Sequence, residues 1–279
     1  MRRCFRYIII LIVVLNFVNN IRISAMELPN DDKILMQKED SLQKIKEKGI
    51  LTVVSSNRIP FSYKDPETGK FTGADAEIVK EVANRLGIEK ISVVYVPFAT
   101  VMEELIRNSQ YDILGESILI TEERKNLVNF TNPIYNIGEA IVTRKDSGIN
   151  NKEDLKNSTI GILGSSVFVS IAEKWKNEGI IKNYMILYNS NDLQKALENK
   201  AIEAILTNSI TGKSIILRNP KLNFKVVLLE KNKYKGAYVL RKEDTSLLNA
   251  VNEKLKEMRD DGTLYEIMTR YNLTEDYIP

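Results

Sequence analysis

The sequence predicts an α/β protein with two lobes, and three observations support this fold class. Short apolar runs suited to buried strands alternate with segments whose apolar residues recur at helical spacing. The alternation stops at an extended stretch, 134–144, and then begins again. A final strand-like run leads into helices that we expect to return to the first lobe. Such alternation favours a mostly parallel sheet covered by helices on both faces.

The first α/β unit starts with the apolar run 50–54, which lies between Gly49 and two serines. Apolar residues at helical spacing predict a helix over 75–86, with Asp75 capping its start and Gly87 its end. The unit is expected to contain strands at 50–54, 91–96 and 111–118 and helices at 75–86 and 101–107.

The second unit repeats this order after the extended stretch. It is expected to contain strands at 159–163, 185–188 and 204–207, helices at 166–178 and 193–199, a later strand at 236–240 and an amphipathic helix at 246–259. Asp261 and Gly262 mark the end of that last helix.

These elements predict a first lobe of residues 42–138 and 236–279 and a second lobe of residues 139–235. Extended segments near 136–144 and 229–238 are expected to join the lobes as two hinge crossings. A cleft between two lobes is a common place for a small ligand.

Residues 1–25 are predicted to be a secretory signal peptide. A basic start precedes the apolar run 7–18, and Ala25 offers a small residue for cleavage. The run of twelve residues is shorter than the roughly 20 that span a bilayer, so a signal is favoured over an uncleaved membrane anchor, which stays the alternative. Cys4 precedes the run, so no lipoprotein anchor is expected. Residues 26–41 are expected to form a polar spacer.

Composition excludes several kinds of chemistry. The 279 residues include no His and one Cys, which excludes His-dependent catalysis, His-ligated metal sites and an intramolecular disulfide. We expect no metal site, no cofactor and no catalytic residues. Four of the 40 basic residues and none of the 37 acidic residues lie in the first 25, so the rest has a net charge near −1. No basic patch remains for nucleic acid.

Several motifs occur in an order that resembles the family 3 solute-binding proteins, the extracytoplasmic receptors of ABC importers for polar amino acids. The resemblance covers about residues 42–278. The motifs are Ile59-Pro-Phe-Ser-Tyr63, Gly69-Lys-Phe-Thr-Gly-Ala-Asp75, Ile120-Thr-Glu-Glu-Arg124, Phe130-Thr-Asn-Pro133, Asp154-Leu155 with Gly161-Ile-Leu-Gly-Ser-Ser166, and Leu240-Arg-Lys-Glu-Asp244 with Asp261-Gly-Thr-Leu264.

The resemblance implies a fold, a function and partners. The fold would be the two-lobed periplasmic-binding-protein-like fold of type II, with a mostly parallel sheet in each lobe. The protein would be a periplasmic or extracytoplasmic monomer, exported across the inner membrane and tethered there if the signal is not cleaved. It would capture a small polar solute, an amino acid or related carboxylate, and deliver it to an ABC permease in the membrane.

Two segments are expected to bind the ligand's carboxylate. The resemblance places the carboxylate-binding arginine at Arg124, whose planar guanidinium can hold two oxygens at once. The alternative is that Arg124 pairs with nearby acidic residues. Gly164, Ser165 and Ser166 lie between a predicted strand and helix, where free N–H groups and hydroxyls attract an anion. The alternative is an ordinary helix cap.

The subsite for an ammonium group departs from the family pattern. Asn208 stands where relatives usually have Asp, and Leu119 stands where Ser or Thr is common. Ser117 can still offer its backbone carbonyl or hydroxyl. Glu116 is a candidate for the missing negative charge, unless this strand residue faces away.

Arg58 and Phe98 are expected to contact the ligand's side chain, because aromatic residues are usual at both positions in relatives. If Arg58 faces the cleft, it would disfavour a cationic ligand and favour an acidic or polar neutral one; the alternative is a solvated loop cation. Phe98 would stack on the ligand or belong to the core. Two other functions stay open: a ligand-sensing receptor subunit that signals through a membrane partner, and a periplasmic dehydratase on the same fold.

Overall fold

The computed structural model describes residues 40–273 and residue 277. The predicted signal at 1–25 and nearly all of the predicted spacer at 26–41 lie outside the described residues.

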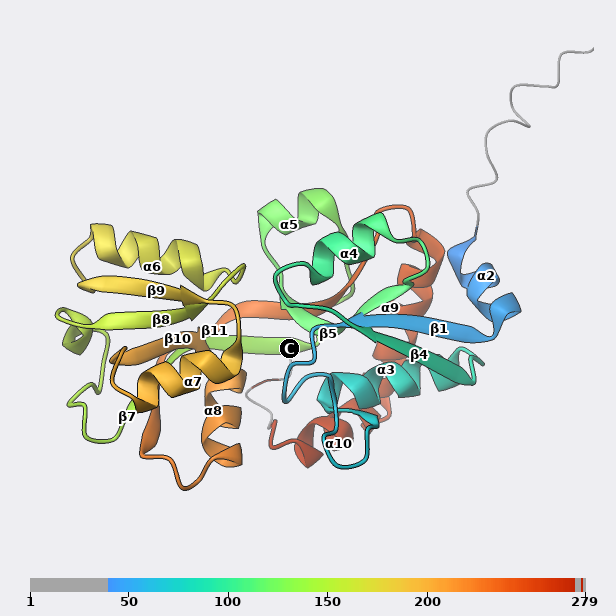
Figure 1. Cartoon of the computed structure of the whole chain (residues 1–279). Coiled ribbons are helices and arrows are strands. Elements are labelled where there is room, and N and C mark those ends of the chain that lie inside the picture. Colours follow the sequence, from blue (N-terminus) through green and yellow to red (C-terminus); the bar gives the residue numbers. More distant parts are fainter. Residues whose placement is uncertain (1–39, 274–276, 278–279) are drawn as a thin grey trace, which may run out of the picture. The chain divides into compact units, whose positions relative to one another are not determined.

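One nine-stranded sheet runs through the described part of the chain (Figure 1). Its order is β4 (Lys90–Tyr95), β1 (Ile50–Ser55), β5 (Ile113–Leu119), β11 (Phe224–Leu240), β7 (Tyr135–Arg144), β10 (Ala204–Asn208), β8 (Thr159–Leu163) and β9 (Asn183–Leu187), with the short β6 (Asn129–Phe130) paired to β11. A separate hairpin joins β2 (Tyr63–Lys64) and β3 (Phe71–Thr72).

The two ends of the sheet are parallel and its centre is antiparallel. β1 is parallel to both β4 and β5, and β8 is parallel to both β9 and β10. β11 and β7 pair with each other antiparallel along most of their length and connect the two halves. Their register shifts between Leu228 and Tyr234. The predicted α/β class with mostly parallel halves is therefore confirmed.

Helices cover both faces of each half (Figure 1). Beside the first half lie α2 (Ser41–Lys48), α3 (Ala74–Arg85), α4 (Val101–Arg107), α5 (Glu122–Leu127), α9 (Thr245–Asp260) and α10 (Thr263–Arg270). Beside the second half lie α6 (Phe168–Asn177), α7 (Ser190–Glu198) and α8 (Ser209–Arg218), with the short 3₁₀ turn η2 (Glu153–Leu155). α9 and α10 pack against α3, so the C-terminal helices do return to the first half.

Alternation along the strands separates the core into layers. In β1 and β5, Val53 and Ile113 belong to the cluster that contains α3 and α9, whereas Val54 and Leu114 pack with α4 on the other face. Because successive side chains of a strand point to opposite faces, these apolar runs are buried on both sides.

The structure differs from the predicted elements in several places. β11 starts at Phe224, twelve residues before the predicted 236–240, and α8 was not predicted. The sequence of α8 is rich in β-branched residues and serine, which gives a weak helical signal. α6 begins at Phe168 and not at Ser166.

Asp75 does not cap α3, so that prediction is wrong. Gly73 precedes the helix, while Asp75 is fully buried in its first turn. The Asp75 carboxylate accepts hydrogen bonds from the backbone N–H of Ser117 (2.6 Å) and from the hydroxyls of Tyr135 (2.8 Å) and Tyr238 (3.2 Å). Asp75 therefore connects α3, β5 and the two strands that link the halves.

Candidate ligand-binding site

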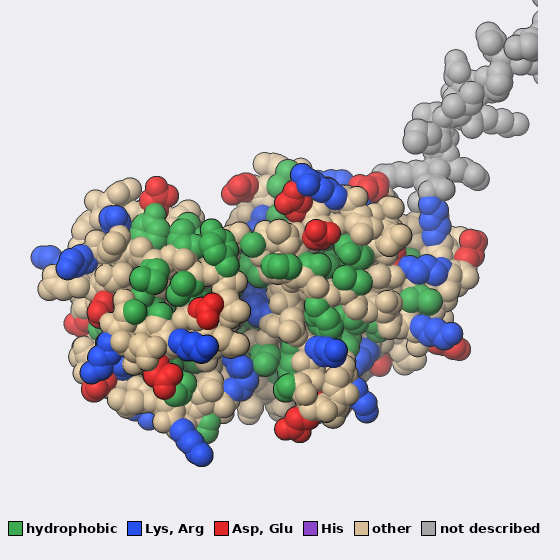
Figure 2. Space-filling model, viewed as in Figure 1, with side chains coloured by type: hydrophobic (Ala, Val, Ile, Leu, Met, Phe, Trp, Pro, Cys, Tyr) green, Lys and Arg blue, Asp and Glu red, His purple; other side chains and the backbone are tan. Residues whose placement is uncertain are grey.

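A cavity of about 470 Å³ lies where parallel strands of both halves end. Its lining includes residues that come shortly after β1, β4 and β9, together with the last residues of β8 and β10. The carboxyl ends of strands are the usual binding edge of open α/β sheets, and this volume suits a small ligand. Figure 2 shows a groove between the two halves, with basic side chains (blue) visible in it.

A smaller cavity of about 30 Å³ adjoins the first and shares five of its lining residues. It brings together seven of the eight predicted site residues, namely Arg58, Phe98, Ser117, Leu119, Arg124, Ser166 and Asn208. These residues come from both halves and span 150 positions of the sequence. The two cavities together form the candidate site.

Arg124 lies between the two halves. α5 begins after Thr121, whose hydroxyl accepts a hydrogen bond from the Arg124 N–H. Its guanidinium donates to the carbonyl of Leu119 (2.9 Å) and, across the cleft, to the carbonyl of Ser165 (3.5 Å). Burial lowers the pKa of Arg124, and the positive charge of Arg58 adds to the effect. Among the described residues no carboxylate pairs with Arg124, so its charge is open to an anion.

The turn before α6 differs from the predicted helix cap. Ser166 is not the cap, because its hydroxyl donates to the carbonyl of Leu163 (2.6 Å) and the helix begins two residues later. Ser165 has a left-handed backbone (φ 61°) and lines neither cavity with its side chain. Val167 and Phe168 line the small cavity, and the first N–H groups of a helix have no partner within that helix.

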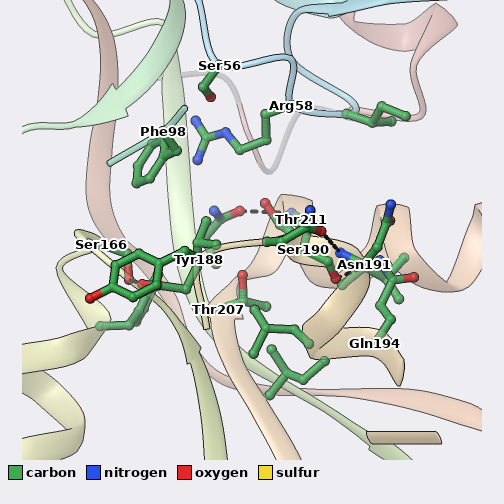
Figure 3. Close-up of a pocket in the computed structure, with 18 of the residues that line it drawn as sticks. Ser56, Arg58, Phe98, Ser166, Tyr188, Ser190, Asn191, Gln194, Thr207 and Thr211 are labelled. Atoms are coloured by element: carbon green, nitrogen blue, oxygen red, sulfur yellow. Dashed lines mark hydrogen bonds between the residues drawn. The ribbon is translucent and has the colours of Figure 1, made fainter. Parts of the chain in front are cut away.

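Arg58 faces the cleft and is not a solvated loop cation, which was the alternative. Its guanidinium lies 4.6 Å from the ring centre of Phe61 and 4.8 Å from that of Phe98, so it is held between two aromatic rings. It donates to the carbonyl of Ser117 (2.7 Å) and lies 3.8 Å from the Glu116 carboxylate. Figure 3 shows Arg58 and Phe98 side by side above the cavity.

Glu116 does not face the cleft. Its carboxylate is fully buried and accepts hydrogen bonds from the Ser55 hydroxyl and from the N–H and hydroxyl of Ser56. It lines neither cavity. Leu119 presents an almost buried apolar side chain to the small cavity. Neither residue therefore provides an acceptor for an ammonium group.

Asn208 is both the last residue of β10 and the N-cap of α8. Its side-chain oxygen accepts a hydrogen bond from the N–H of Thr211 (2.8 Å). Because that oxygen is engaged by the helix, the amide NH₂ group must point the other way. Asn208 lines both cavities, so it presents a donor where an acceptor was expected.

The second half provides a polar wall that the sequence analysis missed. Tyr188, Ser190, Asn191, Gln194 and Thr211 face the cavity opposite Arg58 and Phe98 (Figure 3). The signal was the polar run that follows the predicted strand 185–188, which is a strand end followed by a helix start.

The charge of the lining is one-sided. Arg58, Arg124 and Arg218 line the two cavities, and no Asp or Glu does so among the residues that the structure describes. Within the same residues, no group of three or more His, Cys, Asp or Glu is placed to hold a metal ion. The site can therefore bind a small anion or carboxylate through arginines, hydroxyls and amides.

Comparisons with known proteins agree with this geometry. The bacterial extracellular solute-binding proteins, family 3, match residues 50–274. The arginine-binding extracellular protein ArtP of Bacillus subtilis is 26% identical over 228 residues, 80% of this chain and 86% of that protein. The probable ABC transporter extracellular-binding protein YckB of the same organism is 30% identical over 246 residues, 84% of this chain and 82% of that protein.

The chain also resembles the solved structure of a binding protein. An ancestral arginine-binding protein bound to glutamine is 28% identical, with a TM-score of 0.73, and covers 81% of this chain and 98% of that one. The type II periplasmic-binding-protein-like fold is thus confirmed, and each of the named relatives is described as a binding protein. The chain belongs to the bacterial extracellular solute-binding proteins, family 3.

Proposed function

We propose that the chain captures an amino acid or a related carboxylate outside the cytoplasm and delivers it to an ABC importer. The observation that carries this proposal is Arg124, a cation without a carboxylate partner among the described residues, which already contacts both halves of the cleft. A carboxylate bound there would touch both halves and favour their closed arrangement. The names of the relatives support the ligand class and the transporter partner.

The proposed site of action is extracytoplasmic. The family match supports this location. Between residues 40 and 273, and at residue 277, no helix is both long and apolar enough to cross a membrane. Export would depend on the predicted signal at 1–25, and a monomer bound to a membrane permease remains our expectation.

A thermal-shift screen tests the proposed function. The purified protein is heated with each of the amino acids, with small mono- and dicarboxylates and with opines. A ligand that binds only the folded protein, present at about 100 times its Kd, adds about 2.7 kcal/mol to the free energy of unfolding. We therefore expect a rise in Tm of several degrees for at least one carboxylate. No shift with any compound would contradict the proposal.

Asn208 allows the ammonium subsite to be tested by one substitution. Asn208→Asp adds a negative charge where the family resemblance implies one, and Asp also caps helices well, so α8 is preserved. We expect the variant to improve binding of an amino acid relative to its amino-free analogue about tenfold, the effect of roughly 1.4 kcal/mol. Calorimetry with glutamate and glutarate measures this ratio.

The matched control is Asn208→Ser, which keeps a capping oxygen but adds no charge. It should leave the glutamate-to-glutarate ratio close to that of the unchanged protein. An unchanged ratio in Asn208→Asp as well would show that an ammonium group is held elsewhere.

A further inference from the structure

The ammonium subsite holds a cation from the protein itself. The Ser117 carbonyl, an expected acceptor for a ligand ammonium, instead accepts a hydrogen bond from the Arg58 guanidinium. A second expected acceptor, the side-chain oxygen of Asn208, is used by the N–H of Thr211. The Ser117 hydroxyl is the expected oxygen that has no hydrogen-bond partner among the described residues, whereas Arg58 and the Asn208 amide bring N–H groups to the subsite.

Unused donors remain around this point. The Nε of Arg58 is buried and makes no hydrogen bond in the described part of the chain, and neither does the hydroxyl of Thr211. Both residues line the larger cavity. Buried donors without partners cost free energy, so a ligand that supplies acceptor oxygens here would gain from pairing them.

The negative charge near Arg58 is turned away from the cavity. The Glu116 carboxylate lies 3.8 Å from the Arg58 guanidinium, accepts hydrogen bonds from Ser55 and Ser56, and lines neither cavity. The stacking of the guanidinium between Phe61 and Phe98 fixes its position next to the cavity. An arginine held in this way is prepared to bind an acidic group with little loss of side-chain entropy.

We propose that the ligand is a dianion, and that Arg58 binds its second acidic group while Arg124 binds the first. This inference rests on the proposed function and narrows its ligand class. Two sources share the required chemistry: an acidic amino acid, and a dicarboxylate without an amino group. A cationic ligand would face repulsion from both arginines, and a neutral amino acid would leave the Arg58 donors without an acidic partner.

Calorimetry on matched ligands tests the inference. The protein, freed of co-purified ligand by dialysis, is titrated with glutamate, glutarate, aspartate, succinate, glutamine and arginine. We expect the best dianion to bind at least about tenfold more tightly than glutamine, and the difference to shrink at high salt. Tighter binding of glutarate than glutamate would identify the amino-free source, and the reverse would identify the acidic amino acid.

The Arg58→Gln variant locates the effect. In this variant the Kd of the dianion should lie within about threefold of the Kd of glutamine, because only one arginine then remains for two acidic groups. The matched control is Arg107→Gln on α4, which removes the same charge from a side chain that is 77% exposed and lines neither cavity. It should leave the preference for the dianion intact. A melting curve confirms that each variant is folded.

Two results would overturn the inference without touching the proposed function. One is tighter binding of glutamine or arginine than of every dianion by the unchanged protein, a measurement that needs no variant. The other is a preference for the dianion that survives Arg58→Gln. If none of the six ligands binds and the wider screen is also silent, the proposed function fails together with the inference.

Discussion

Arg124→Ala is expected to abolish measurable binding of the carboxylate ligand. The guanidinium is the cation of the small cavity that reaches both halves, donating to the carbonyls of Leu119 and Ser165. Truncating one partner of a buried, charge-assisted pair costs about 3 to 5 kcal/mol, so the Kd should rise roughly 100-fold or more. Calorimetry with the best ligand of the screen measures the loss.

The variant should stay folded, because Arg124 belongs to a short, largely exposed helix and has no carboxylate partner among the described residues. Arg124→Lys is the conservative control. It keeps the charge but loses the bidentate contact, so its affinity for the ligand should lie between that of the unchanged protein and that of Arg124→Ala. Undiminished affinity in Arg124→Ala, with a normal melting curve, would mean that the carboxylate lies elsewhere.

The free energy of unfolding is expected to fall as the pH rises from about 5 to about 7.5. Burial, and to a lesser degree the charge of Glu116, raise the pKa of Asp75 from 3.8 to about 7. Between these two pKa values the folded protein holds a proton that the unfolded chain has released. The protonated Asp75 therefore stabilises the folded state at low pH, and this contribution is lost as the pH rises through the folded pKa of about 7. The full difference of about three pKa units corresponds to on the order of 4 kcal/mol, of which about two units, or roughly 3 kcal/mol, fall between pH 5 and 7.5.

Urea unfolding at several pH values between 5 and 8 measures this slope. The chain has no His, so few other side chains titrate in this window. Asp75→Asn cannot ionise and should give a nearly flat profile. Parallel profiles for the two proteins would show that Asp75 is already charged at pH 5, held so by its three hydrogen-bond donors.

Local patterns predicted most of the strands and helices because a buried strand or an amphipathic helix is encoded in neighbouring residues. The strand at 159–163 lies where the pattern placed it. α8 was missed, since its burial depends on contacts with β7 and not on a strong periodicity of its own. The cap expected at Asp75 was wrong because its partners are 42, 60 and 163 positions away.

The candidate site shows the same limit. Resemblance to a family supplied the residues around Arg124, and the structure brings all but Ser165 to one small cavity. Their hydrogen-bond partners could not be predicted: neither the contact of Arg58 with Ser117, 59 positions away, nor the use of the Asn208 oxygen by α8 is written in the local sequence. These two contacts decide which ligand groups the site can accept.

The order of the strands in the sheet also affects the order in which the two halves can fold during synthesis. The half around β8, β9 and β10 draws its parallel strands and the helices between them from one stretch of chain, so it can assemble as soon as that stretch is available. The other half needs β11 beside β5, and its helices α9 and α10 come last in the sequence. Closing such long loops is slow. During synthesis from the N-terminus, the half that begins first therefore lacks β11, α9 and α10 until nearly the whole chain has been made, whereas the strands and helices of the other half are already complete.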